Sequence, residues 1–105
     1  MSSKLFALLG MARRAGQIAA GESQVEALLK KRKGYLLILA EDSPGAINKF
    51  ERWAKDINIP VLLVENKHEL GLALGLSPRS AVLIMDRGFA RAIWQEKNQV
   101  KKNYP

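Results

Sequence analysis

The chain has 105 residues, of which 48% are hydrophobic, and it contains no cysteine. This length and composition fit one domain with a hydrophobic core of its own, and they exclude disulfide bonds and cysteine nucleophiles. The formal net charge of +7 favours a polyanionic partner, with nucleic acid ahead of an anionic membrane surface.

Helices are predicted where apolar residues recur every three or four positions. Five segments have this spacing, over about residues 2–15, 21–34, 43–57, 66–75 and 86–97. Ser43 and Asp86 are the expected N-caps of the third and fifth helices. Asn66 and Glu69 have the spacing of a capping box at the start of the fourth.

Short apolar runs between the helices predict strands that are covered on both faces. Three such runs are residues 35–40, 61–64 and 80–85, and residues 16–20 are compatible with a fourth strand. Helices that alternate with strands in this way indicate the α/β class and a three-layer α/β/α sandwich. No repeat or linker interrupts the pattern, so we expect a single domain over residues 1–97 and a polar, basic tail, residues 98–105, that frays.

The apolar N-terminal segment is expected to belong to this domain. Arg13 and Arg14 follow the short stretch from Leu5 to Leu9 before it could span a bilayer, so neither a signal peptide nor a transmembrane helix is predicted. Together with the absence of cysteine, this favours a cytoplasmic protein.

Signatures of catalysis and metal binding are weak. The single histidine, His68, is expected on the surface, and one histidine without cysteine does not make a zinc site. Glu41 and Asp42 follow the first long strand at its carboxyl end, where α/β sheets bind ligands, and such carboxylates can serve in acid–base chemistry or hold magnesium. Because no second catalytic group accompanies them, we favour a structural turn and predict no enzyme activity, no cofactor and no metal site.

Basic residues give a stronger signal. Lys30, Lys31, Arg32 and Lys33 are consecutive at the end of the second predicted helix. Arg13 and Arg14 end the first helix, and Arg79 lies in the loop before the last strand. Such cations can contact phosphates if they share one face of the molecule. The alternative is that they complement the helix dipoles and stay solvated.

Several segments, taken in order, resemble one protein family. The second helix opens with Gly21-Glu22-Ser23-Gln24, and the strand that ends in Glu41-Asp42 follows at the expected distance. Residues 58–61 (Asn-Ile-Pro-Val) and 69–75 (Glu-Leu-Gly-Leu-Ala-Leu-Gly) come next. Over about residues 4–95, this order resembles the kink-turn-binding ribosomal proteins of the L7Ae and L30e type. The block from Arg79 to Ala90 is similar to the short bacterial branch of that superfamily, whose members are described as ribosomal or RNA-binding proteins.

The resemblance implies a four-stranded mixed sheet and an RNA-binding edge. That edge is formed by the start of the second helix, the Glu41-Asp42 turn and the loop that carries Arg79. The family's best binders have a Gly-x-Asn-Glu-like motif at the helix start, with a lysine further along. This chain keeps the glycine as Gly21 and has Ser23, Gln24 and Ala27 at the amide, acidic and lysine positions.

We therefore expect non-catalytic binding of structured RNA, with ribosomal RNA among the candidates, by a monomer. The expected contact residues are Gly21, Glu22, Ser23, Gln24, Lys30, Lys31, Lys33, Glu41, Arg13, Arg14 and Arg79. Ser23 cannot form a bidentate amide pair and Ala27 carries no charge, so the sequence supports RNA binding in general better than kink-turn binding in particular. The alternatives are a protein-interaction module whose RNA site has eroded and, third, a small enzyme that uses Glu41 and Asp42.

Overall fold

Helices and strands alternate from one end of the chain to the other in the computed structural model, which describes residues 1–98, 104 and 105. The helices are α1 (Ser3–Arg14), α2 (Glu22–Lys30), α3 (Pro44–Asp56), α4 (Lys67–Leu74) and α5 (Arg87–Asn98). The strands are β1 (Ile18–Ala20), β2 (Leu36–Ala40), β3 (Val61–Val64) and β4 (Ala81–Ile84). The α/β class and the presence of a strand within residues 16–20 are confirmed.

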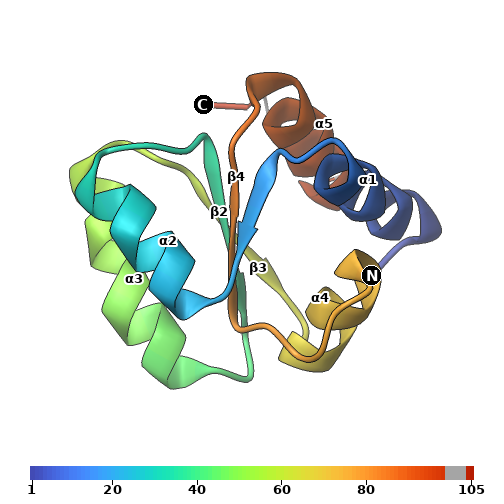
Figure 1. Cartoon of the computed structure of the whole chain (residues 1–105), viewed down its shortest axis with the longest axis horizontal. Coiled ribbons are helices and arrows are strands. Elements are labelled where there is room, and N and C mark those ends of the chain that lie inside the picture. Colours follow the sequence, from blue (N-terminus) through green and yellow to red (C-terminus); the bar gives the residue numbers. More distant parts are fainter. Residues whose placement is uncertain (99–103) are drawn as a thin grey trace.

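The strands form one mixed sheet in the order β1-β4-β2-β3. β4 is antiparallel to both β1 and β2, with Leu83 opposite Ala19 and Leu37, whereas β2 and β3 are parallel. Figure 1 shows the sheet almost edge-on, with α2 and α3 covering one face and α1, α4 and α5 the other. The predicted α/β/α sandwich with a four-stranded mixed sheet is therefore confirmed.

Two apolar cores hold the layers together, one on each face of the sheet. Leu5, Leu9, Leu70 and Ile93 are buried between the sheet and α1, α4 and α5. Val25, Leu29, Phe50 and Ala54 are buried on the opposite face, beneath α2 and α3. β2 and β4 lie inside the sheet and are buried along their whole length, as their continuous apolar runs predict.

Leu63 on β3 is exposed, which corrects the expectation that residues 61–64 form a fully buried strand. β3 also lies at the edge of the sheet, where it pairs only with β2 among the described strands. A run of four apolar residues therefore does not by itself distinguish a central strand from an edge strand.

Side-chain caps fix three of the helix starts. The Glu69 N–H donates to Asn66 Oδ1 over 2.7 Å, and the Phe89 N–H donates to Asp86 Oδ2 over 2.8 Å, as predicted for α4 and α5. Ser2 caps α1 in the same way. The predicted cap of α3 is wrong, because the Ser43 hydroxyl bonds to the Ser80 hydroxyl over 2.9 Å and makes no capping hydrogen bond.

The C-terminal tail, predicted to fray, lies mostly outside the described residues, since these omit 99–103. Asn98 is the last residue of α5, and its amide donates to the Trp94 carbonyl over 2.8 Å. The Tyr104 ring packs edge-on against Trp94, with 6.4 Å between ring centroids, and its hydroxyl donates to the Tyr35 carbonyl.

Candidate nucleic-acid interface

One end of the sheet brings together three segments that are far apart in the sequence; we name it the Gly21 end. The Gly21 N–H donates to Ala81 O, and the Ala40 N–H donates to Ser80 O, each over 3.0 Å. These bonds hold the start of α2 and the turn after β2 against the loop before β4. The lower part of Figure 1 shows these connections meeting beneath the sheet. The expected RNA-binding edge is therefore a contiguous region of the molecule.

The N-terminus of α2 is open at this end. Gly21 has φ 109° and ψ 153°, a conformation that L side chains rarely adopt, and it provides no side-chain cap. α1, α4 and α5 each start with a side chain that accepts a backbone N–H, whereas α2 and α3 do not. Uncapped first-turn N–H groups and the helix dipole together favour an incoming anion or hydrogen-bond acceptor.

Arg79 stands beside this open helix end. Its Nε lies 3.9 Å from the position that a Cβ atom on Gly21 would occupy. Its Nη1 donates to the Ser77 carbonyl over 3.0 Å and to the Ser77 hydroxyl over 2.6 Å. The guanidinium is therefore held in place by its own loop while its positive charge remains next to the helix start.

Gln24 and Arg13 extend this region along the exposed side of β1. The Gln24 side-chain carbonyl accepts the Ala20 N–H over 3.3 Å, which leaves the amide NH₂ group able to donate elsewhere. Arg13 Nη1 donates to the Leu74 carbonyl over 2.8 Å at the end of α4. Arg13, Gln24 and Arg79 line a shallow hollow of about 360 Å³ together with Ile18, Ala20 and Leu76.

The two acidic residues of the turn have different roles. Asp42 Oδ1 accepts the Lys67 N–H over 3.0 Å, so it stabilises the start of α4, as the structural interpretation of this turn predicts. The Glu41 N–H donates to Val64 O over 2.8 Å, while its side chain is exposed at the Gly21 end. Glu22 and Ser23 are also exposed there, in the first turn of α2. Within the described residues, no group of three or more potential ligands could hold a metal ion.

The consecutive basic residues lie at the opposite end of the sheet from Gly21, so the condition that they share one face with it is not met. α2 ends at Lys30, so Lys31, Arg32 and Lys33 belong to the following turn, and Arg32 takes φ 57° there. This turn leads into Tyr35, whose N–H donates to Ile84 O over 2.8 Å. The five residues of β2 separate the two ends by about 16 Å.

Lys30 is set apart from its basic neighbours by an ion-pair cluster. Glu26 contacts Lys49 Nζ at 2.7 Å and Lys30 Nζ at 3.3 Å, which links α2 to α3. The hydrogen bond from Lys49, followed by that from Lys30, lowers the pKa of Glu26 below its ordinary value. Lys30 is therefore already partly neutralised, whereas Lys31 and Lys33 form no ion pair with any described carboxylate.

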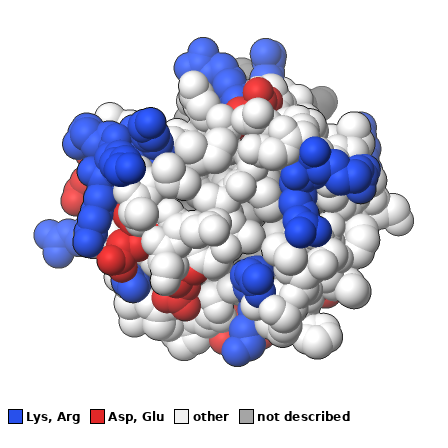
Figure 2. All heavy atoms as spheres, in the orientation of Figure 1, with Lys and Arg blue, Asp and Glu red and all other residues white. Residues whose placement is uncertain are grey.

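The remaining cations lie in several groups. Figure 2 shows Lys and Arg side chains in separate clusters around the rim of this face, with uncharged surface in its centre and acidic side chains beside several of the clusters. Arg14 is exposed on the last turn of α1. Arg87, which sequence analysis did not select, places its guanidinium 5.8 Å from the centroid of the Tyr35 ring. No helix among the described residues has the length and apolarity needed to cross a bilayer.

Comparisons with known proteins agree with this architecture. The chain is 32% identical to the RNA-binding protein YlxQ of Bacillus subtilis over 89 residues, which cover 84% of this chain and 89% of that protein. It is 28% identical to large ribosomal subunit protein eL8 of Thermoplasma volcanium over 90 residues, 84% of this chain and 74% of that protein. A solved protein of unknown function from Bacillus halodurans C superposes with a TM-score of 0.86 at 32% identity, covering 92% of this chain and 99% of that one.

The sequence model of one family matches nearly the whole domain. The match spans residues 3–93, from the start of α1 into α5, and it includes all three segments of the Gly21 end. The resemblance seen in the order of the sequence blocks is thereby confirmed. The chain belongs to the ribosomal protein L7Ae/L30e/S12e/Gadd45 family.

Proposed function

We propose that this protein binds structured RNA without catalysing a reaction, and that the Gly21 end contacts the RNA. The observation that carries the proposal is the uncapped N-terminus of α2 beside the Arg79 guanidinium. A phosphate or a base-edge acceptor placed there would accept hydrogen bonds from backbone N–H groups of α2 and would lie close to the positive charge of Arg79. The similarity to an RNA-binding protein and to a ribosomal protein supports RNA, with ribosomal RNA among the candidates.

Six of the selected residues have a definite role in the proposal. Gly21 permits close approach of the RNA backbone, because it has no side chain beyond its α-carbon. Ser23 and the free amide of Gln24 supply hydrogen bonds, and Glu41 accepts them. Arg79, with Arg13 in the same hollow, supplies charge.

We further propose that the selectivity for kink-turns is weak. The amide position of the family motif is Ser23 and the lysine position is Ala27, and both side chains are exposed on α2. A good bidentate pair with a base contributes about 1–3 kcal/mol of discrimination, which serine does not provide. The proposed binding unit is the monomer in the cytoplasm, with residues 1–97 as the RNA-binding domain.

The test is a titration of the purified protein with three RNAs at two salt concentrations: a kink-turn, a matched plain duplex and a single strand. We expect the kink-turn to bind somewhat more tightly than the duplex, and all binding to weaken steeply with salt. Arg79→Gln should weaken kink-turn binding and lower the salt slope by about 1. Binding to none of the three RNAs would contradict the proposal and favour a protein-interaction module.

A further inference from the structure

A second cationic region lies at the other end of the sheet; we name it the Tyr35 end. It consists of the turn after α2, the first residue before β2 and one face of the first two turns of α5. Its members are Lys31, Arg32, Lys33, Tyr35, Arg87 and Arg91. Neither the family resemblance nor the proposed function at the Gly21 end uses these residues as a group.

Tyr35 joins the two sources of charge. Arg32, Lys33 and Tyr35 line one hollow of about 430 Å³ with Gly34 and Met85. Arg87 places its guanidinium over the Tyr35 ring, 5.8 Å from the ring centroid. Tyr35 is 41% exposed as a residue, whereas most large apolar and aromatic residues in the described part of the chain are covered. The Tyr35 end thus presents a partly exposed aromatic residue with cations beside it.

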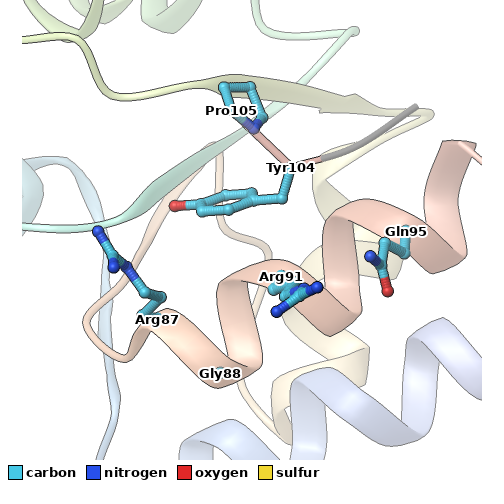
Figure 3. A pocket seen from close by; sticks show the side chains of 6 residues that line it. All are labelled: Arg87, Gly88, Arg91, Gln95, Tyr104 and Pro105. Atoms are coloured by element: carbon cyan, nitrogen blue, oxygen red, sulfur yellow. The ribbon is translucent and has the colours of Figure 1, made fainter.

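The α5 side of this region is a broad hollow. It has a volume of about 520 Å³ and is lined by Arg87, Gly88, Arg91, Gln95, Tyr104 and Pro105. Figure 3 shows Arg87, Arg91 and Gln95 on successive turns of α5, with the Tyr104 ring lying over the first turns of the helix and its hydroxyl toward Arg87. Arg87 and Arg91 are four residues apart, so they project from one helix face.

The cations at this end have no ion-pair partner in the part of the chain that the structure describes. All five cations are exposed, and none forms an ion pair with a described carboxylate. The nearest acidic side chain along the chain, Asp86, is engaged as the cap of α5. Like charges gathered at one end of the molecule repel one another, and an external polyanion relieves that repulsion.

We propose that the Tyr35 end is a second RNA-contacting surface, which binds the backbone of a single-stranded segment and stacks one base on the Tyr35 ring. This inference rests on the proposed RNA binding at the Gly21 end and adds the class of RNA segment that flanks the structured element. Exposed cations beside an aromatic ring are the combination that binds single strands, since phosphates take the charge and any base can stack.

The experiment compares one kink-turn RNA with the same RNA carrying a single-stranded extension of about ten nucleotides, a length within the range of single-strand sites. Affinity is measured by fluorescence anisotropy across a salt series. For the unaltered protein, we expect the extension to tighten binding about tenfold and to steepen the salt slope by about 2. Lys33→Gln combined with Arg87→Gln should remove both effects of the extension while leaving binding of the RNA without extension almost unchanged.

A matched control removes two charges elsewhere. Arg52→Gln combined with Lys55→Gln lowers the net charge by the same amount, at exposed positions of α3 that form no ion pair with a described carboxylate. This pair should retain the gain from the extension. Tyr35→Leu should reduce the gain about fivefold, and Tyr35→Phe should preserve it because the ring remains. Circular dichroism of each variant would verify that the fold is kept.

The outcomes separate this inference from the proposed function. Binding of the kink-turn RNA with no gain from the extension, or an equal loss in both charge-removal pairs, would overturn the second surface alone. A Tyr35 end that binds vesicles containing phosphatidylserine, with no effect of the Lys33 and Arg87 substitutions on RNA, would overturn it in favour of a membrane. Absence of all RNA binding would overturn both proposals.

Discussion

The cations at the two ends of the sheet differ in the bonds that they form with the rest of the protein. At the Gly21 end, the Arg13 and Arg79 guanidinium groups donate to backbone carbonyls of Leu74 and Ser77, so their positions are fixed. At the Tyr35 end, Lys31 and Lys33 extend into solvent and form no ion pair with a described residue. Fixed groups beside an open helix end suit recognition of shape, whereas mobile charges suit attraction of any backbone. Net charge alone therefore does not locate the site at which RNA would be recognised.

The largest expected effect comes from disrupting the Gly21 end through Gly71. A Cβ atom on this buried glycine would lie 2.2 Å from the Ser77 carbonyl oxygen and 2.9 Å from Pro78 Cα. Gly71→Ala must therefore displace the loop that carries Arg79, at a cost of about 3 kcal/mol in the free energy of unfolding. Urea unfolding measures this cost. Gly45→Ala is the control, because a Cβ there meets nothing within 4 Å. Equal urea midpoints for the two variants would contradict the close packing of Gly71 against the loop that carries Arg79.

The corresponding change at the Tyr35 end is Gly34→Ala. Gly34 has φ 113°, and a Cβ atom there would lie 2.6 Å from Leu83 Cδ1. We expect a loss of about 2 kcal/mol, less than for Gly71→Ala, because a side chain yields more readily than backbone. Binding of an RNA with a single-stranded extension should suffer more than binding of the kink-turn itself. An equal loss of affinity for both RNAs would indicate that the two ends do not contribute independently to RNA binding.

A smaller and opposite effect is expected from restoring the family motif on α2. Ser23→Asn combined with Ala27→Lys supplies the missing amide and lysine at exposed positions, so the fold should tolerate both. The amide should tighten kink-turn binding by about 1 kcal/mol, roughly fivefold, without a similar gain for plain duplex. Competition titrations with the two RNAs provide the measurement. Equal gains for both RNAs would mean that only the added charge acts.

The smallest effect concerns Glu26, midway between the two ends. Its folded-state pKa is lowered by Lys49 and then by Lys30, so its ion pairs stabilise the protein above the unfolded pKa of about 4.3. That contribution is lost as the pH falls through the lower folded pKa. The unfolding midpoint of Glu26→Gln should therefore lie slightly below that of the unaltered protein at pH 7 and converge with it at an acidic pH below the folded-state pKa of Glu26. A constant difference between the two pH values would exclude this explanation.

Much of the fold follows from local patterns in the sequence. The apolar spacing of α1 predicts a helix with one buried face, and the continuous apolar runs of β2 and β4 predict strands buried between two layers of helices. The structure contains all three elements in these positions. The Ser43 cap was predicted wrongly because its hydroxyl instead meets Ser80, 37 positions away in the sequence. Such a tertiary hydrogen bond has no local signal.

The candidate site could be predicted in part, because some of its residues follow from the strand topology. Gly21, Glu41 and Arg79 each lie where a strand and its neighbouring connection meet at one edge of the sheet, so topology brings them together. Lys31 and Lys33 follow a nine-residue helix that carries the chain about 13 Å toward the opposite end. The number of charges in the sequence does not predict that Lys31 and Lys33 lie at the opposite end from Gly21, nor that Arg87 lies over Tyr35.

Contact between RNA and the Gly21 end can be tested by amide chemical-shift mapping during titration with a kink-turn RNA. We expect the largest shifts for residues 21–24, for Glu41 and for Arg79, with a second group at residues 31–35 only when the RNA carries a single-stranded extension. Shifts confined to α3 and the exposed edge of β3, with residues 21–24 unchanged, would contradict it.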